Sequence, residues 1–208
     1  IAMGGAQYVH TFDKCLFMPS DLTAGLEYNR DRLKDNMWGY DRHTDQTVNI
    51  YSAFLQNEWK NERWSILVGG RLDKHNMVDN IIFSPRANLR FNPTQNINLR
   101  LSYSSGFRAP QAFDEDMHIE NVGGTVAMIE RTKNLKEEKS QSFSASADIY
   151  HRFGAFQTNF LIEGFYTKLT DVFVLGEPYN RGDGVLVKLR SNGPGAKVVG
   201  VTLEGKLA

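Results

Sequence analysis

Hydrophobic and polar residues alternate with a period of two along most of the chain. In the segment 142–149, serine and aspartate at even positions alternate with phenylalanine, alanine and isoleucine at odd positions. The segments 22–29, 64–72, 97–103 and 199–207 show the same alternation. Because successive side chains of a strand point to opposite faces, each segment has one apolar and one polar face. No stretch has the period of an amphipathic helix, so the pattern predicts an all-β chain.

Short and long connections alternate between these predicted strands. The connections 60–63, 92–96 and 151–155 are short and contain the asparagine, proline or glycine that favour tight turns. Most of the alternate connections are much longer, and 104–140 and 167–197 exceed ordinary loop lengths. Alternate connections of an antiparallel meander emerge at the same end of the sheet. We therefore predict an antiparallel up-and-down meander with tight turns at one end and long loops at the other.

This asymmetry is typical of outer-membrane β-barrels, in which strands of about ten residues alternate in polarity. The predicted apolar face consists of Leu22, Leu26, Ile66, Val68, Ile97, Leu99, Leu101, Phe143, Ile149, Val201 and Leu203. The predicted polar face includes Arg100, Ser102, Ser144, Asp148 and Glu204. A soluble β-sandwich would show the same partition. The two folds differ in curvature, because the apolar side chains lie on the convex side of a barrel wall but on the packed side of a sandwich.

Aromatic residues gather near both kinds of connection. Those beside the tight turns are Trp59, Trp64, Phe91, Tyr150, Phe153 and Phe156. Those near the long loops are Phe83, Tyr103, Phe165 and Tyr166. Aromatic rings favour the boundary between hydrocarbon and water, and this placement fits two membrane interfaces. Strands also favour aromatic residues in an ordinary core, so the sandwich stays open as an interpretation.

The composition narrows the function classes. The 24 Lys and Arg residues balance 24 Asp and Glu residues, so the chain has no basic field to attract nucleic acid. The single cysteine, Cys15, excludes an internal disulfide framework and a cysteine-rich metal site. No apolar run approaches the roughly 20 residues of a transmembrane helix.

Candidate ligand-contact residues lie in one acidic segment, 113–120. They are Asp114, Glu115, Asp116 and His118. Carboxylates suit hard cations and histidine suits transition metals, but the spacing matches neither an EF-hand nor a His-Glu-x-x-His helix. The segment is thus either a solvated acidic loop or a ligand-contact loop, and it predicts no metal site and no cofactor.

Arg108 is a further candidate, at the junction between a predicted strand and a long loop. Its guanidinium would either contact an anionic ligand or anchor the loop through a salt bridge or backbone carbonyls. The other histidines lie singly in separate segments, where we expect surface or interface positions: His10, His43, His75 and His151. There is no Gly-x-Ser-x-Gly motif and no other catalytic arrangement, so the sequence predicts no enzyme.

Several motifs resemble those of TonB-dependent outer-membrane receptors. The most specific is Gly-Phe-Arg-Ala-Pro at 106–110, at the start of a long loop. Further matches are Ser-Pro-Arg-Ala-Asn-Leu-Arg at 84–90, Phe-Leu-Gln-Asn-Glu-Trp at 54–59, and Ser-Asn-Gly at 191–193 followed by Val-Gly-Val-Thr-Leu-Glu at 199–204. Thr202 replaces the glutamate often seen in the last motif. The resemblance covers nearly the whole chain.

The resemblance implies a partial segment of a transmembrane barrel of about 22 strands in a Gram-negative outer membrane. It also implies active uptake of a scarce nutrient, such as a ferric siderophore, haem or cobalamin. The implied partners are that small-molecule or metal-chelate ligand, the outer-membrane lipid, and TonB, which acts through a plug domain and a TonB box that nothing here resembles. Residues 1–208 would then form about nine or ten strands, without the plug and without the final strands.

Two other function classes remain open from the residues alone. One is a complete small barrel of about 8–10 strands that acts as a porin or adhesin. The other is a soluble all-β module whose loops bind a carbohydrate. A complete barrel would pair its first and last strands, whereas a soluble sandwich would bury its apolar face.

Overall fold

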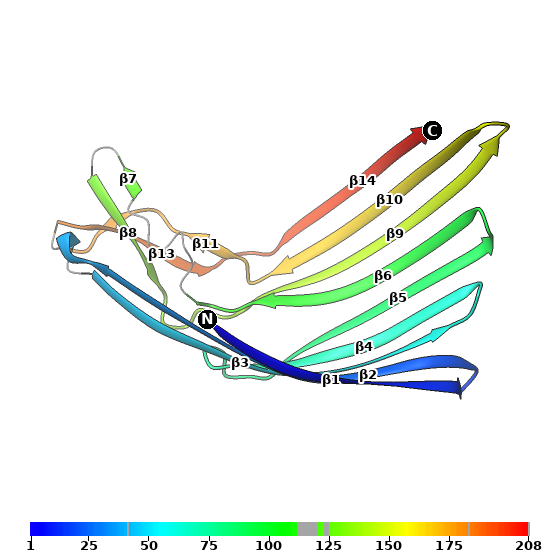
Figure 1. Cartoon of the computed structure of the whole chain (residues 1–208). Coiled ribbons are helices and arrows are strands. Elements are labelled where there is room, and N and C mark those ends of the chain that lie inside the picture. The colour runs from blue at the N-terminus through cyan, green and yellow to red at the C-terminus, as the bar shows by residue number, and fades with distance from the viewer. Residues whose placement is uncertain (41, 112–119, 123–124, 183, 208) are drawn as a thin grey trace.

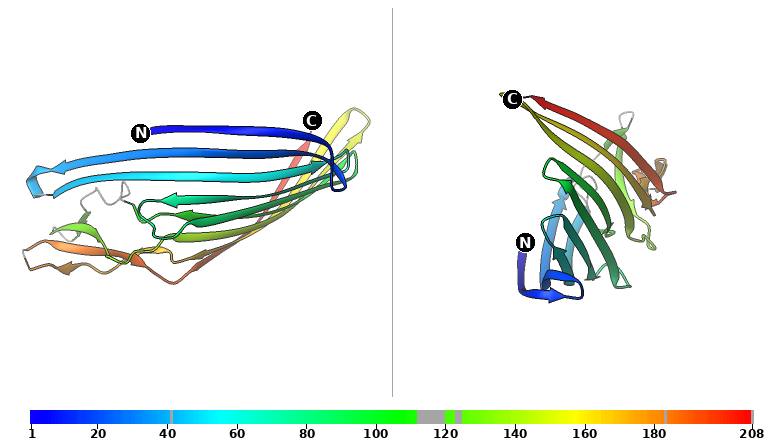
Figure 2. Two further views of the ribbon diagram at one scale, coloured as in Figure 1. Left: turned by 90° about the horizontal axis from the view of Figure 1, so that it is seen from below. Right: turned by 90° about the vertical axis from the view of Figure 1, so that its right-hand side faces the viewer.

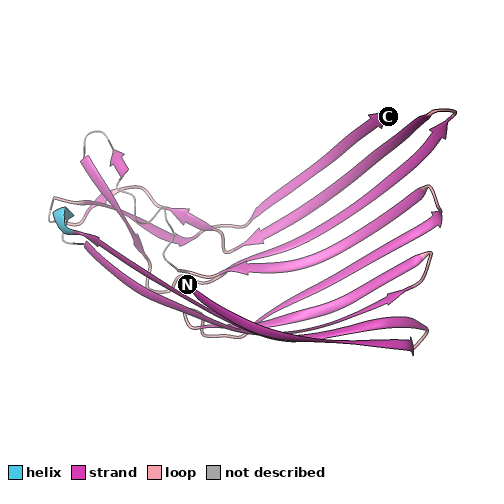
Figure 3. Ribbon diagram, in the orientation of Figure 1, coloured by secondary structure: helices cyan, strands magenta, loops and turns pink. Residues whose placement is uncertain are grey.

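The computed structural model describes residues 1–40, 42–111, 120–122, 125–182 and 184–207 (Figure 1). Nearly all of the described chain is β-strand, as Figure 3 shows, and its one helical element is the 3-10 turn η1 (Trp38–Tyr40). Within the described residues, no helix is long and apolar enough to cross a membrane. The all-β prediction is confirmed.

Nine long strands form the main sheet. They are β1 (Ala2–Cys15), β2 (Met18–Met37), β3 (Arg42–Lys60), β4 (Trp64–His75), β5 (Ile82–Thr94), β6 (Ile97–Arg108), β9 (Glu138–Phe153), β10 (Phe156–Thr170) and β14 (Ala196–Leu207). They lie side by side in sequence order, and each neighbouring pair is antiparallel. This is the predicted meander.

The two longest connections contribute a second, five-stranded sheet, which we call the loop sheet. It consists of β7 (Glu120–Val122), β8 (Thr125–Arg131), β11 (Phe173–Leu175), β12 (Tyr179–Asn180) and β13 (Leu186–Asn192). β8 lies in the connection after β6, and β13 lies in the connection after β10. The two strands pair in parallel, so backbone hydrogen bonds join the two long connections into one unit.

The short and long connections separate to opposite ends of the main sheet (Figure 1). The turns after β1, β3, β5 and β9 share one end of the sheet, at the right of the view. Three of them are the predicted turns 60–63, 92–96 and 151–155. Gly154 has a φ of 59° in the β9–β10 turn, a conformation that costs glycine little. The loop sheet and η1 lie at the other end, which we call the loop end.

The strand registers separate the side chains into the two predicted faces. Ala147 of β9 lies opposite both Leu99 of β6 and Ile162 of β10. Ile162 in turn lies opposite Leu203 of β14. Followed across all nine strands, these registers place every predicted apolar residue on one face, the apolar face. Arg100, Ser102, Ser144, Asp148 and Glu204 all lie on the other, the polar face.

The main sheet is curved, and the loop sheet lies on its concave side (Figure 2). Two contacts show which face this is. The guanidinium carbon of Arg108, on the polar face of β6, lies 5.0 Å from the ring centroid of Phe173 in β11. The Phe173 backbone N–H donates to Glu138, on the polar face of β9, at 3.0 Å. The polar face is therefore concave and the apolar face convex, as predicted for a barrel wall.

The apolar face carries no second layer of protein. Leu26, Leu101 and Val201 are 66%, 54% and 70% exposed. A β-sandwich would bury such residues against another sheet. The described strands β1 and β14 are the two edges of the sheet and do not pair with each other, so the sheet is an open wall and not a closed small barrel.

Buried apolar residues concentrate at the loop end instead. Val187 of β13 and Ala127 of β8 are almost fully buried where the two parallel strands meet. A second small core, formed by Val78, Ile82 and Ala109, packs the β4–β5 connection against the residues that follow β6. These cores hold the long connections in place over the polar face.

Candidate functional site

A hydrogen-bonded polar cluster lies on the polar face, toward the loop end. The Arg71 guanidinium donates to Asp73 at 2.8 Å and to the Ser52 hydroxyl at 2.8 Å, and it pairs with Glu27 at 2.7 Å. The Ser52 hydroxyl donates to Asp73 at 2.6 Å. Asp73 and Ser52 are buried, so the Arg71 charge and these hydrogen bonds compensate a carboxylate that has lost its water. We call these four residues the Arg71 cluster.

His75 lies at the end of β4, two positions beyond Asp73, and its position corrects a prediction. We expected a surface or interface histidine, but only 1% of its area is exposed. Its Nδ1 accepts a hydrogen bond from the Met77 backbone N–H at 3.0 Å, because the β4–β5 connection turns back over it. The alternation of β4 placed His75 on the polar face, but its burial depends on how the β4–β5 connection packs against the residues that follow β6.

Arg108 is the only predicted ligand-contact residue that the described part of the chain contains. It is exposed at the end of β6 and stacks on Phe173, and so it joins the wall to the loop sheet. A cation–π contact at an exposed site contributes about 0.5–1 kcal/mol. Its part in ligand binding remains a prediction. The other candidates lie outside the described residues: Asp114, Glu115, Asp116 and His118.

A polar pocket of about 480 Å³ opens at the loop end, beside the segment that follows Arg108. The residues that line it include Met77 of the β4–β5 connection, Pro110, the acidic Glu130 and the cationic Arg131 and Lys133. Arg131 donates to the Pro110 carbonyl at 3.0 Å, which ties β8 to the start of the loop. We call this cavity the loop pocket. Among the described residues, no group of three or more His, Cys, Asp or Glu side chains is placed to hold a metal ion.

Sequence reasoning missed the loop pocket and the Arg71 cluster for different reasons. Apart from Met77, the pocket residues lie in a segment interpreted only as a long loop, and nothing local indicated the parallel pairing that orders it. The cluster was visible in part, because alternation put Arg71 and Asp73 on the polar face of one strand. The register with β2 and β3, which brings in Glu27 and Ser52, required the structure.

Aromatic side chains form two rows on the apolar face. The inner row, beside the tight turns, consists of Phe12, Trp59, Trp64, Phe91, Phe153 and Phe156. The outer row, toward the loop end, consists of Tyr28, Tyr51, Phe83, Tyr103, Phe143 and Tyr166. Some neighbouring rings are in contact, with centroids 4.1 Å apart for Trp64 and Phe91 and 4.7 Å for Tyr103 and Phe143.

The separation of the two rows fits a bilayer. Tyr51 and Trp59 lie eight positions apart in β3, as do Phe83 and Phe91 in β5. At a rise of ~3.3 Å per residue and a tilt of ~40°, eight residues span roughly 20 Å along the membrane normal, close to the apolar band of ~25 Å in outer-membrane barrels.

Two of the predicted interface residues belong elsewhere. Tyr150 and Phe165 lie on the polar face, where the Tyr150 hydroxyl donates to Asp148 at 2.9 Å. Proximity to a connection had grouped them with the interface aromatics, but the alternation of β9 and β10 turns them inward. Phe165 covers Gly200 of the neighbouring strand, whose missing side chain leaves room for the ring.

Comparisons with known proteins give a consistent result. The family model described as "TonB dependent receptor-like, beta-barrel" matches residues 4–208. No curated protein sequence matches the chain. Similar solved structures include the siderophore receptor PirA from Pseudomonas aeruginosa, with a TM-score of 0.79 and 17% identity over 98% of this chain and 38% of that one.

Two other receptors share the fold. PirA from Acinetobacter baumannii has a TM-score of 0.72 and 18% identity, over 99% of this chain and 34% of that one. The hemophore receptor HasR from Serratia marcescens, in a double-mutant complex with HasA and heme, has a TM-score of 0.71 and 12% identity, over 99% and 39%. The 208 residues thus span less than two-fifths of each of these proteins.

Proposed function

The chain belongs to the TonB-dependent receptor family, as part of its β-barrel, and we propose from this that it forms wall and outer loops of a receptor that takes up a scarce nutrient. Members of this family are integral β-barrels of the Gram-negative outer membrane, and they are receptors and transporters rather than enzymes. The observation that carries the proposal is the match of the family model to residues 4–208. These residues form an open, curved sheet whose concave face is polar and whose convex face is apolar.

In this proposal the apolar face meets lipid and the polar face lines the lumen. Barrels of this family close with about 22 strands, and the nine strands of the main sheet would be one part of such a wall. The remaining strands and the plug domain would come from other parts of the parent protein. The Arg71 cluster would offer the plug a rigid polar surface, because its side chains already hold one another in place.

The ligand would be a small metal chelate of the ferric siderophore, haem or cobalamin type. The related structures are receptors for siderophores and for a hemophore, which supports this class without selecting one member. Arg108, Arg131 and Lys133 at the loop end would favour an anionic chelate, because Glu130 of the loop pocket is already paired with Arg181. The segment with Asp114, Glu115, Asp116 and His118 would contribute further contacts. TonB would then act on the plug and open a path along the polar face.

Uptake by the full-length parent receptor tests this proposal. A strain that lacks its own receptors, and that expresses the parent protein, is supplied with each class of iron chelate and with cobalamin in turn. We expect accumulation of one class that stops in a strain without TonB and after addition of a protonophore. Solute flux that persists without TonB would contradict the proposal and favour a porin.

A further inference from the structure

Three lysines lie on the apolar face, just beyond the outer aromatic row. Lys168 follows Tyr166 by two positions in β10, so both side chains share a face. Lys197 of β14 lies directly opposite Lys168. Lys139, four positions before Phe143 in β9, has the same parity. Cations are thus placed on the membrane-facing side of the sheet, where they follow immediately on residues suited to the bilayer interface.

Protein groups leave most of this positive charge uncompensated. Lys139 pairs with Glu137 at 3.0 Å. Lys168 and Lys197 are exposed, and neither forms an ion pair with another part of the described chain. Like charges directly opposite each other on neighbouring strands destabilise a sheet. The pair therefore fits an anionic group that neutralises both ammonium groups.

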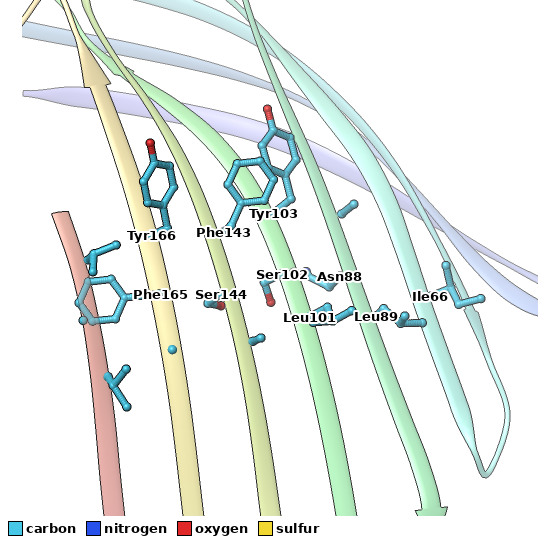
Figure 4. Close-up of a pocket in the computed structure, with 16 residues that line it drawn as sticks. Ile66, Asn88, Leu89, Leu101, Ser102, Tyr103, Phe143, Ser144, Phe165 and Tyr166 are labelled. Atoms are coloured by element: carbon cyan, nitrogen blue, oxygen red, sulfur yellow. The ribbon is translucent and has the colours of Figure 1, made fainter. Parts of the chain in front are cut away.

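An apolar depression of about 910 Å³ lies next to these lysines, on the same face. The surface is hollowed there because the residues on that part of the apolar face are small, namely Ala87 in β5, Ala145 in β9 and Gly164 in β10. Tyr103, Phe143 and Tyr166 border it on the side of the loop end, and both tyrosine hydroxyls point toward that end (Figure 4).

A smaller, more polar depression of about 350 Å³ adjoins it. Tyr103 lines both depressions, whereas Ser105, Gln141 and the ion pair of Lys139 with Glu137 line only the smaller one. An apolar trough thus continues, past a tyrosine, into a polar recess beside the lysines. This order of apolar, interfacial and cationic surfaces matches the order of acyl chain, glycerol or sugar, and phosphate in a membrane lipid.

We propose that this surface is a binding site for a membrane lipid with a phosphate headgroup. Its acyl chains lie in the apolar depression, and its phosphate contacts Lys168 and Lys197. The tyrosine hydroxyls of the outer row lie at the boundary and donate to the headgroup. A lipid is the occupant that fits, because this face is the convex, membrane-facing side of the wall. The inference rests on the place of the chain in the outer membrane and not on which nutrient is transported.

Lipid binding to the purified full-length receptor tests the site. Native mass spectrometry compares the retention of phosphatidylglycerol and phosphatidylcholine with identical acyl chains. In the double variant Lys168→Gln, Lys197→Gln, we expect phosphatidylglycerol affinity to fall by about tenfold, since each cation at a membrane surface attracts anionic lipid. Phosphatidylcholine retention should stay the same.

A matched control removes two charges elsewhere. Lys60 is on the polar face of β3, and Lys206 is on the polar face of β14. The variant Lys60→Gln, Lys206→Gln should retain the preference for phosphatidylglycerol. A third variant, Ala145→Trp, fills the apolar depression and should lower the retention of both lipids. Unchanged preference in the Lys168, Lys197 variant, or an equal loss in the control, would overturn the proposal. Nutrient uptake by the same variants is measured separately, so that a failure of the lipid site can be told apart from a failure of the proposed function.

Discussion

The wall and the loop sheet obey different rules within one chain. In the wall, strands that neighbour each other in the sheet also follow each other along the chain, and every pair is antiparallel. Large apolar side chains are exposed on one of its faces. In the loop sheet, β8 and β13 come from distant segments, pair in parallel and bury their apolar residues. The wall thus presents its apolar side chains to lipid, whereas β8 and β13 of the loop sheet pack theirs into a small core.

The largest effect should come from a charge on the lipid side of the wall. Leu101→Arg places a guanidinium on the apolar face between the two aromatic rows. We expect the free energy of unfolding of the full-length receptor in lipid to fall by about 2–4 kcal/mol. The neighbouring Ser102→Arg points the same group to the polar face and should cost much less. Equal losses would contradict the difference between the faces.

A smaller loss should follow from the Arg71 cluster. Asp73→Asn removes the buried charge that Arg71 and Ser52 compensate and leaves their donors poorly matched. We expect a loss of about 1–3 kcal/mol in the free energy of unfolding, typical of a buried hydrogen-bonded group. Glu27→Gln changes the more exposed partner of Arg71 and should cost less. An unaffected Asp73→Asn variant would show that the cluster does not stabilise the wall.

The loop sheet can be loosened without the wall. The Asn192 side chain donates to the carbonyls of Lys136 and Asp171, at 3.1 and 2.7 Å, and accepts from the Lys136 N–H at 2.8 Å. Asn192→Ala should lower the local opening free energy of β11 and β13 by about 1–2 kcal/mol. Hydrogen exchange measures this strand by strand. Faster exchange in β4 and β5 as well would mean that the two regions unfold together.

The smallest effect is a dependence on pH in the β2–β3 hairpin, beyond the outer aromatic row. Arg32 donates to Asp45 at 3.0 and 2.6 Å, and this hydrogen bond lowers the pKa of Asp45 from its ordinary value of 3.8. A lowered pKa means that the pair stabilises the hairpin above that value and is lost as the pH falls through the folded-state pKa.

Spin labels on the two hairpin strands measure this opening. The distance distribution should broaden at low pH in the native protein. It should already be broad at neutral pH in Asp45→Asn, and should then change little on acidification. A native hairpin whose distances do not change with pH would contradict a role for this pair.

The regular part of the fold could be predicted because its pairing is local. Alternation alone assigned the faces of residues such as Leu101 and Ser102, and connection lengths separated the two ends. The loop sheet could not be predicted, because the pairing of Ala127 with Leu186 depends on tertiary contacts between segments about 60 residues apart. His75 was misplaced because alternation assigns a face and not a burial, and the β4–β5 connection that covers His75 is held by its tertiary contact with the residues after β6.

The central claim is that the apolar face meets lipid while the polar face lines a water-filled lumen. Spin labels at Leu101→Cys and Ser102→Cys, in the full-length receptor with Cys15 replaced by serine and reconstituted in liposomes, test it directly. Collision with oxygen, which concentrates in lipid, should be high at position 101, and collision with a water-soluble nickel chelate should be high at position 102. The reverse pattern, or equal accessibility at both positions, would contradict the account.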